Sequence, residues 1–128
     1  MMLPSLLSVS LLVSHTAASY DYAEVLRKSL KFYQAQRSGN LSVGNTIEWR
    51  QSSHLDDRGE DGEDLSGGYY DAGDTVKFGF PLSSSLTVLA WGGLQYEEGY
   101  KAAGSLADLE ETVRWVGQSG GWGCTIMC

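Results

Sequence analysis

The segment GGYYDAGDTVKFGFP, residues 67–81, is the most informative part of this 128-residue sequence. It places Asp71 and Asp74 three positions apart, among glycines and aromatic rings. The spacing alone favours a structural role, in which Asp74 caps the following helix and pairs with Lys77 while Asp71 stabilises a turn. The alternative is that both carboxylates act chemically, and the rest of the sequence must decide between the two interpretations.

Hydrolysis of a glycosidic bond needs two carboxyl groups, one that protonates the leaving oxygen and one that acts as base or nucleophile. Two aspartates as close as Asp71 and Asp74 could instead share one task, in which one takes a proton from a water and the other orients that water. The surrounding glycines permit sharp turns and a close approach of the backbone to a ligand. Tyr69, Tyr70 and Trp49 carry flat rings that suit the apolar faces of sugars, so they are candidate substrate-binding residues.

Outside this segment, the hydrophobic pattern predicts an all-α protein with about three helices. Apolar side chains recur at helical period over residues 21–37, 82–96 and 105–116, and no stretch alternates as a strand would. Residues 38–68 form a long glycine-rich and acidic loop that leads into the aspartates. Loops of this length inside a compact domain are often functional.

The composition of the second helix, residues 82–96, predicts that further parts of the protein surround it. No charged residue lies between Lys77 and Glu97, and a helix without a polar face is buried on most sides. We expect Trp91 and Trp115, on the second and third helices, to lie in the core. Three helices offer too few partners for such a helix, so the sequence resembles the front of a larger helical protein.

The two ends of the chain differ from its body. Residues 1–19 contain an apolar stretch, no charged side chain and a small-residue end, which predicts a secretory signal peptide and a secreted protein. Residues 20–117 form the body of the chain, and residues 118–128 a divergent tail. The only cysteines, Cys124 and Cys128, lie in that tail and form either a local disulfide or free thiols.

The net charge of −7 and a pI near 4.6 argue against nucleic acid and anionic membranes as partners, and are compatible with a neutral substrate. We expect no cofactor and no metal site. An acidic run precedes the aspartates, but the EF-hand spacing would need a glutamate where Gly68 stands, so we interpret the run as a solvated loop. The run consists of Asp56, Asp57, Glu60, Asp61, Glu63 and Asp64.

The longer string DLSGGYYDAGDTVKFGFP closely resembles the signature of glycoside hydrolase family 9, the inverting endoglucanases of bacteria, plants and invertebrate animals. DYAEVLRKSLKFYQAQRSG resembles the first helix of that family, and NTIEWRQSSHL its tryptophan-arginine segment. PLSSSLTVLAWGGLQYEEGYKAAGSLADLEETVRWVGQ resembles its next two helices. The resemblance extends from about residue 21 to about residue 117.

This resemblance implies that residues 20–117 are the N-terminal part of a glycoside hydrolase catalytic domain, which folds as an (α/α)6 barrel. It also implies the hydrolysis of β-1,4-glucan, such as cellulose, with inversion. In the DAGD motif of the family the second aspartate is the catalytic base, here Asp74, and the first supports the attacking water, here Asp71. The catalytic acid of the family is a glutamate near the C-terminus of a much longer chain. No segment here resembles that region, so we expect this chain to be inactive alone and the full-length form to be a monomer.

Two departures qualify the resemblance. Ser52 stands where the family usually has an aspartate after the tryptophan-arginine pair, which leaves the contacts of that carboxylate open. The tail after Gly117 does not continue the family pattern, and biological truncation or a gene-model error would each explain it. If the short chain is a real product, the alternative function is a secreted glucan-binding fragment or decoy without catalysis.

Asn40-Leu41-Ser42 also matches the N-glycosylation sequon.

Overall fold

The computed structural model describes residues 20–42 and 44–117, and its regular elements are four helices. These are α1 (Tyr22–Ala35), α2 (Gly79–Gln95), α3 (Glu97–Ala102) and α4 (Leu106–Gly117). Within these described ranges there is no named strand, only isolated β-bridges between loop residues. The all-α class and the three expected helices are therefore confirmed. The expected signal peptide and the whole divergent tail, with both cysteines, lie outside the described residues.

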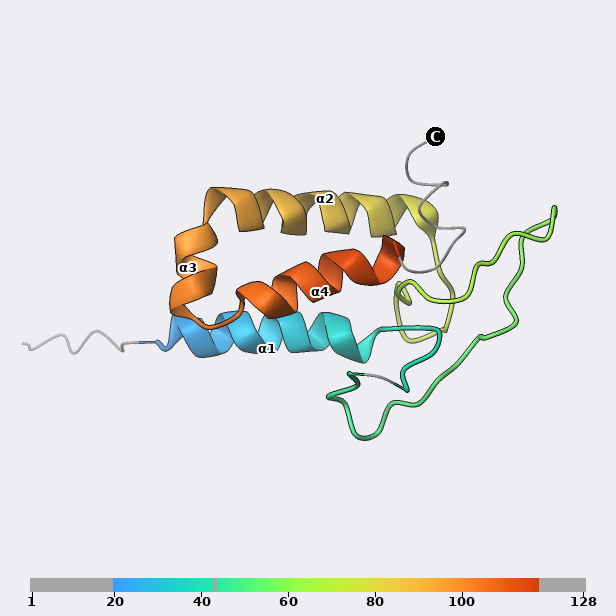
Figure 1. Cartoon of the computed structure of the whole chain (residues 1–128), viewed down its shortest axis with the longest axis horizontal. Coiled ribbons are helices and arrows are strands. Elements are labelled where there is room, and N and C mark those ends of the chain that lie inside the picture. Colours follow the sequence, from blue (N-terminus) through green and yellow to red (C-terminus); the bar gives the residue numbers. More distant parts are fainter. Residues whose placement is uncertain (1–19, 43, 118–128) are drawn as a thin grey trace, which may run out of the picture.

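Helix α4 lies between α1 and α2, and the short α3 crosses one end of the group (Figure 1). The sequence pattern did not predict α3, because its six residues are too few to establish a helical period. The long loop leaves the helices at the opposite end, where α1 finishes and α2 begins (Figure 1). None of the helices in the described ranges is long and apolar enough to cross a membrane.

Helix α1 begins as the capping pattern predicts. The side chain of Asp21 accepts a hydrogen bond from the backbone N–H of Glu24 at 2.9 Å, which satisfies one of the free donors of the first turn. The helix ends at Ala35, two residues before the predicted boundary. Leu30 and Gln34 are its buried residues, and Gln34 also binds the long loop, because its Oε1 accepts from Thr46 Oγ1 at 2.8 Å.

The core lies where α2 and α4 meet the end of the long loop. Tyr69 from the loop, Leu82 from α2 and Val116 from α4 form the buried cluster. Gly93 of α2 leaves space for the Leu109 side chain of α4, since a Cβ at position 93 would lie 2.5 Å from Leu109 Cδ2. Trp115 packs against this cluster, so its expected core position is confirmed.

One face of α2 is uncovered by the described residues. Phe80, Val88, Trp91 and Leu94 are 85%, 66%, 68% and 83% exposed. The prediction of a core position for Trp91 is wrong for this chain, because the residue lies on the uncovered face, whereas Leu82 and Gly93 face the core. The apolar character of this face is the feature that predicted a larger helical assembly.

The predicted loop of residues 38–68 is held by backbone pairing rather than by strands. Gly39 and Ser53 exchange hydrogen bonds at 2.9 and 3.0 Å, and the N–H of Ser38 donates to the carbonyl of Gly68 at 2.9 Å. A Cβ on Gly39 would lie 2.7 Å from the Cα of Gly67, and Gly39 has a φ of 97°, so only glycine suits this crossing. The crossing ties the start of the loop to the segment that carries the aspartates.

Candidate active site

Asp71 and Asp74 lie on a closed turn between the core and the start of α2. The N–H of Asp71 donates to the carbonyl of Val76 at 3.0 Å, and the N–H of Val76 donates to Asp74 Oδ1 at 3.2 Å. Thr75 has a φ of 63°, a left-handed conformation that a non-glycine residue rarely adopts. Both aspartates are exposed, so their carboxylates are accessible to water and to a ligand.

The purely structural interpretation of these aspartates is half correct. Asp74 does stabilise a local turn, but it does not cap α2, whose N-cap residue Phe78 makes no side-chain cap hydrogen bond. Lys77, the expected ion-pair partner of Asp74, instead places its ammonium 2.5 Å from Asp57 Oδ2 in the acidic loop. Within the described ranges, Asp74 Oδ2 and both carboxylate oxygens of Asp71 take part in none of these contacts.

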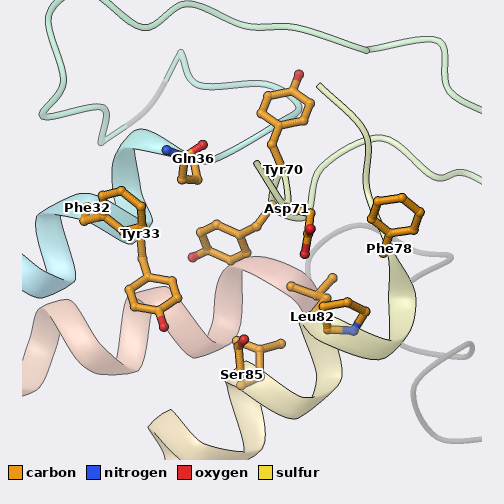
Figure 2. A pocket seen from close by; sticks show the side chains of 11 residues that line it. Phe32, Tyr33, Gln36, Tyr70, Asp71, Phe78, Leu82 and Ser85 are labelled. Atoms are coloured by element: carbon orange, nitrogen blue, oxygen red, sulfur yellow. The ribbon is translucent and has the colours of Figure 1, made fainter. Parts of the chain in front are cut away.

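A cavity of about 180 Å³ opens beside Asp71. Figure 2 shows that Tyr70 and Asp71 point in different directions from the chain, with Asp71 directed toward Leu82 of α2. The cavity brings together three of the predicted site residues, Tyr69, Tyr70 and Asp71, whereas Asp74 and Trp49 are not among its lining residues. The other lining residues are Phe32, Tyr33, Gln36, Phe78, Pro81, Leu82, Ser85 and Leu86.

Tyr70 is fixed by contacts that the sequence did not reveal. Its hydroxyl oxygen lies 2.5 Å from His54 Nδ1 and 2.7 Å from Ser53 Oγ, and the Arg50 guanidinium lies 5.3 Å from the centre of its ring. His54 adopts a φ of 52° at this contact. A strained backbone at such a position is typical of functional sites. No sequence pattern marks His54 as the partner of Tyr70, because the two residues lie 16 positions apart on an irregular loop.

Tyr69 lies deeper and joins the site to α4. It is 6% exposed, its hydroxyl donates to the carbonyl of Thr112 at 2.8 Å, and its ring meets that of Tyr33 edge to face. Burial raises the pKa of the Tyr69 phenol above its ordinary value. Tyr70 is equally buried, so little of either ring is open in this chain, and sugar stacking by these two tyrosines stays a prediction.

Arg37 is a buried residue that the sequence did not single out. Its side chain is 4% exposed, its Nη1 lies 2.8 Å from Glu111 Oε1 of α4, and its guanidinium lies 4.6 Å from the centre of the Trp115 ring. Trp115 Nε1 in turn donates to the carbonyl of Gly68 at 3.2 Å. These contacts bind the end of α1 and the last turns of α4 to the segment just before Asp71.

Trp49 occupies a different place from the tyrosines. It is 73% exposed, and the guanidinium of the adjacent Arg50 lies 5.9 Å from the centre of its ring. Its ring is thus available for stacking, but away from the cavity described above. Ser52, which replaces the usual aspartate, accepts a hydrogen bond from the N–H of Leu41 at 3.0 Å, so the hydroxyl performs one task that a carboxylate could.

Two carboxylates of the acidic run form ion pairs with nearby basic side chains. Asp57 pairs with Lys77, and Asp64 Oδ1 lies 3.0 Å from Arg58 Nη1. Hydrogen bonds from Ser66 lower the pKa of the exposed Asp64 carboxyl. In the part of the chain that the structure describes, no group of three or more histidine, cysteine, aspartate or glutamate residues is arranged to hold a metal ion.

Comparison with known proteins agrees with this helical fold and its motif. The profile of glycosyl hydrolase family 9 matches residues 22–118. Endoglucanase B of Cellulomonas fimi is 53% identical over 100 residues, which cover 78% of this chain and 10% of that protein. The solved endoglucanase of the termite Nasutitermes takasagoensis is 55% identical with a TM-score of 0.73, over 76% of this chain and 22% of the termite chain. An endoglucanase of Clostridium thermocellum, solved with cellobiose and cellotriose, is 35% identical with a TM-score of 0.70, over 79% and 16%.

The fold and its matches define a segment of a helical glycoside hydrolase. More specifically, the chain belongs to glycosyl hydrolase family 9, and its helices are the N-terminal part of the (α/α)6 barrel of that family. The resemblance found from the DAGD segment is therefore confirmed. The chain spans only about a tenth to a fifth of the length of the relatives described here.

Proposed function

We propose that this chain is the first part of a secreted endo-β-1,4-glucanase that hydrolyses cellulose with inversion at the anomeric carbon. The observation that carries the proposal is the exposed turn on which Asp71 lines a cavity walled by aromatic residues and Asp74 follows three residues later. The cello-oligosaccharides bound to the Clostridium thermocellum relative support β-1,4-glucan as the substrate class. The acidic net charge is compatible with this neutral polymer.

In the proposed mechanism, Asp74 is the general base and Asp71 its helper. Asp74 takes a proton from a water that Asp71 orients, and the water attacks the anomeric carbon as the glycosidic bond breaks. Inversion requires base and acid to stand about 6.5–9.5 Å apart, so that the water fits between the base and the sugar. The exposure of both aspartates leaves room for this water.

The departing oxygen needs a proton from a separate acid. We infer that this acid is a glutamate in the part of the family fold that this chain does not span, consistent with the 22% of the termite endoglucanase chain that it covers. A base without that acid cannot protonate the leaving group, so we expect no measurable hydrolysis from residues 20–117 alone. The assembled enzyme is proposed to act as a monomer.

The test places these residues in a complete enzyme. Residues 22–117 would replace the matching segment of the termite endoglucanase, which is 55% identical in sequence. In this chimera, Asp74→Asn should lower the rate of carboxymethylcellulose hydrolysis by roughly 10²–10⁴-fold, as expected for loss of a general base. Asp71→Asn should lower the rate less, and Asp56→Asn, in the exposed acidic run, should not change it.

Two results of this experiment would contradict the proposal. Retention of most activity by the Asp74→Asn chimera would remove Asp74 from the role of base. The stereochemistry is a separate readout, because proton NMR of freshly released cello-oligosaccharides distinguishes the two anomers. The α-anomer is expected from inversion, and a β-anomer as first product would refute the inverting mechanism.

One observation favours the alternative of a glucan-binding fragment. Trp49 is the most exposed of the three proposed stacking residues, and its availability does not depend on the catalytic acid. Titration of cellohexaose into the isolated chain separates the two functions. Saturable binding that Trp49→Ala abolishes, without cleavage, would support the binding fragment, whereas absence of binding would leave only the enzyme segment.

A further inference from the structure

A candidate attachment site for a glycan lies in the loop between α1 and the aspartates. Asn40, Leu41 and Ser42 fit the sequence Asn-x-Ser, with x other than proline, which is the acceptor sequence for N-linked glycosylation. The proposed hydrolysis uses none of these residues, and none lines the cavity beside Asp71. We propose that Asn40 carries an N-linked oligosaccharide when this chain enters a eukaryotic secretory pathway.

The chain contains a natural comparison, because its only other asparagine, Asn45, lies in the same loop. Asn45 Nδ2 donates to the carbonyls of Ile47 and Arg50 at 3.1 and 2.8 Å, and its Oδ1 accepts from the N–H of Ile47 at 2.9 Å. The carboxamide of Asn45 is therefore fully used by the fold. Its sequence, Asn-Thr-Ile, also lacks the hydroxyl residue at the third position.

Asn40 has the opposite arrangement. Its Oδ1 accepts from the N–H of Ser42 at 3.0 Å and lies 3.4 Å from Ser52 Oγ, and the residue is exposed. Its Nδ2, the atom that a glycan would modify, donates to no residue in the ranges that the structure describes. Substitution of this nitrogen would thus break no hydrogen bond of the fold, in contrast to the same change at Asn45.

The neighbours of Asn40 hold the backbone without enclosing its side chain. Gly39 pairs with Ser53 on one side, and on the other the N–H of Leu41 donates to Ser52 while the Leu41 side chain is 5% exposed. The buried leucine anchors the loop as the asparagine remains outside. A glycan at Asn40 therefore fits the folded chain without rearrangement, on the loop whose Ser53 contacts Tyr70.

The modification needs a donor of one chemical class, an oligosaccharide joined to a lipid through pyrophosphate. Asn40 Nδ2 forms a bond to the anomeric carbon of the first sugar and loses one proton. The bond from that carbon to the pyrophosphate oxygen breaks, and the lipid pyrophosphate leaves with the electron pair. No bond of the protein backbone is made or broken.

The experiment expresses the full chain, residues 1–128, in cultured insect cells, once with its own N-terminal segment and once with a secretory leader of proven function. We expect a gel-mobility shift that peptide-N-glycosidase removes, and tandem mass spectrometry should find Asn40 converted to aspartate by that enzyme. Asn40→Gln and Ser42→Ala should each abolish the shift. Ser42→Thr should preserve it, and the matched control Asn45→Gln should leave it unchanged.

The two leaders separate the glycan from the question of secretion. A glycan with either leader supports the acceptor site, and modification with the proven leader alone would refute only the signal peptide. Lack of modification with the proven leader, in cells that glycosylate a secreted control protein, would overturn the proposal. Neither result depends on endoglucanase activity, so the proposed hydrolysis is tested separately.

Discussion

The uncovered face of α2 predicts how the isolated chain behaves. Phe80, Val88, Trp91 and Leu94 expose between 66% and 85% of their surface, on the helix that also carries the core residue Leu82. Full burial of such a side chain contributes about 1.5–3 kcal/mol. The four together forfeit roughly 4–9 kcal/mol in the isolated chain, which is comparable with the entire stability of about 5–15 kcal/mol that domains usually have.

We therefore expect residues 20–117, expressed alone, to be helical by far-ultraviolet circular dichroism but to melt without a sharp transition. The dye ANS should bind, because the apolar face is open to it. Leu94→Gln should reduce dye binding in the isolated chain with little change in helix content, since Leu94 is 83% exposed. The matched variant Leu109→Gln should lower helix content instead, because Leu109 is 3% exposed and packs at the α2–α4 contact.

The same pair of variants should behave differently in the termite chimera. We expect the remaining barrel helices to cover α2 there, so Leu94→Gln should destabilise the protein by about 1.5–3 kcal/mol, as the loss of a buried leucine does. Urea unfolding followed by circular dichroism measures this change. A single cooperative thermal transition in a monodisperse isolated chain that binds no ANS would refute the reasoning, and so would a Leu94→Gln chimera as stable as its parent.

Three further predictions concern the site and are measured by urea unfolding of the chimera. Tyr69→Phe should cost about 0.5–1.5 kcal/mol, because it removes the buried hydroxyl that donates to Thr112. Burial raises the pKa of Tyr69 above 10.0, so its neutral phenol stabilises the fold fully below pH 10.0. This contribution is lost as the pH rises through the pKa of the folded state. The Tyr69→Phe chimera should therefore lose less stability than its parent as the pH rises above 10.0. His54→Ala and Tyr70→Phe should be non-additive, with a coupling energy of about 0.5–3 kcal/mol, and full additivity would show that their 2.5 Å contact is energetically irrelevant. Asp57→Ala should cost about 1–3 kcal/mol, because it removes the carboxylate that pairs with the Lys77 ammonium, whose side chain is 8% exposed, whereas Asp56→Ala should cost nothing measurable.

The sequence predicted those parts of the fold that depend on local pattern. Helical periodicity and the Asp21–Glu24 capping spacing located α1, and the apolar stripe located α4. Helix α2 was expected to begin near Leu82 but begins at Gly79. The sequence did not predict this start, because the N-cap position holds Phe78 and not a polar capping residue. The exposure of Trp91 could not be predicted from the sequence of α2, since it depends on which helices lie beside α2.

The candidate site divides in the same way. Asp71 and Asp74 follow from a contiguous motif, whereas the contacts of Tyr70 join residues 16 and 17 positions apart along an irregular loop. No periodicity relates such residues, so only the folded backbone brings them together. Arg37 and Glu111 are separated by 74 positions, and their pairing depends on the packing of α1 against α4.

The buried Arg37 explains how a loop without strands can hold the aspartates in place. Its guanidinium meets Trp115 and Glu111 on α4, while its own carbonyl accepts from Arg50 Nη2 at 2.8 Å. Arg50 in turn lies against the Tyr70 ring, and Trp115 donates to the carbonyl of Gly68. The residues on both sides of Tyr69 are thus tied to two helices through one side chain and its neighbours. Asp71 is the first exposed residue after these anchors, so the fold can present an exposed carboxylate from a fixed backbone.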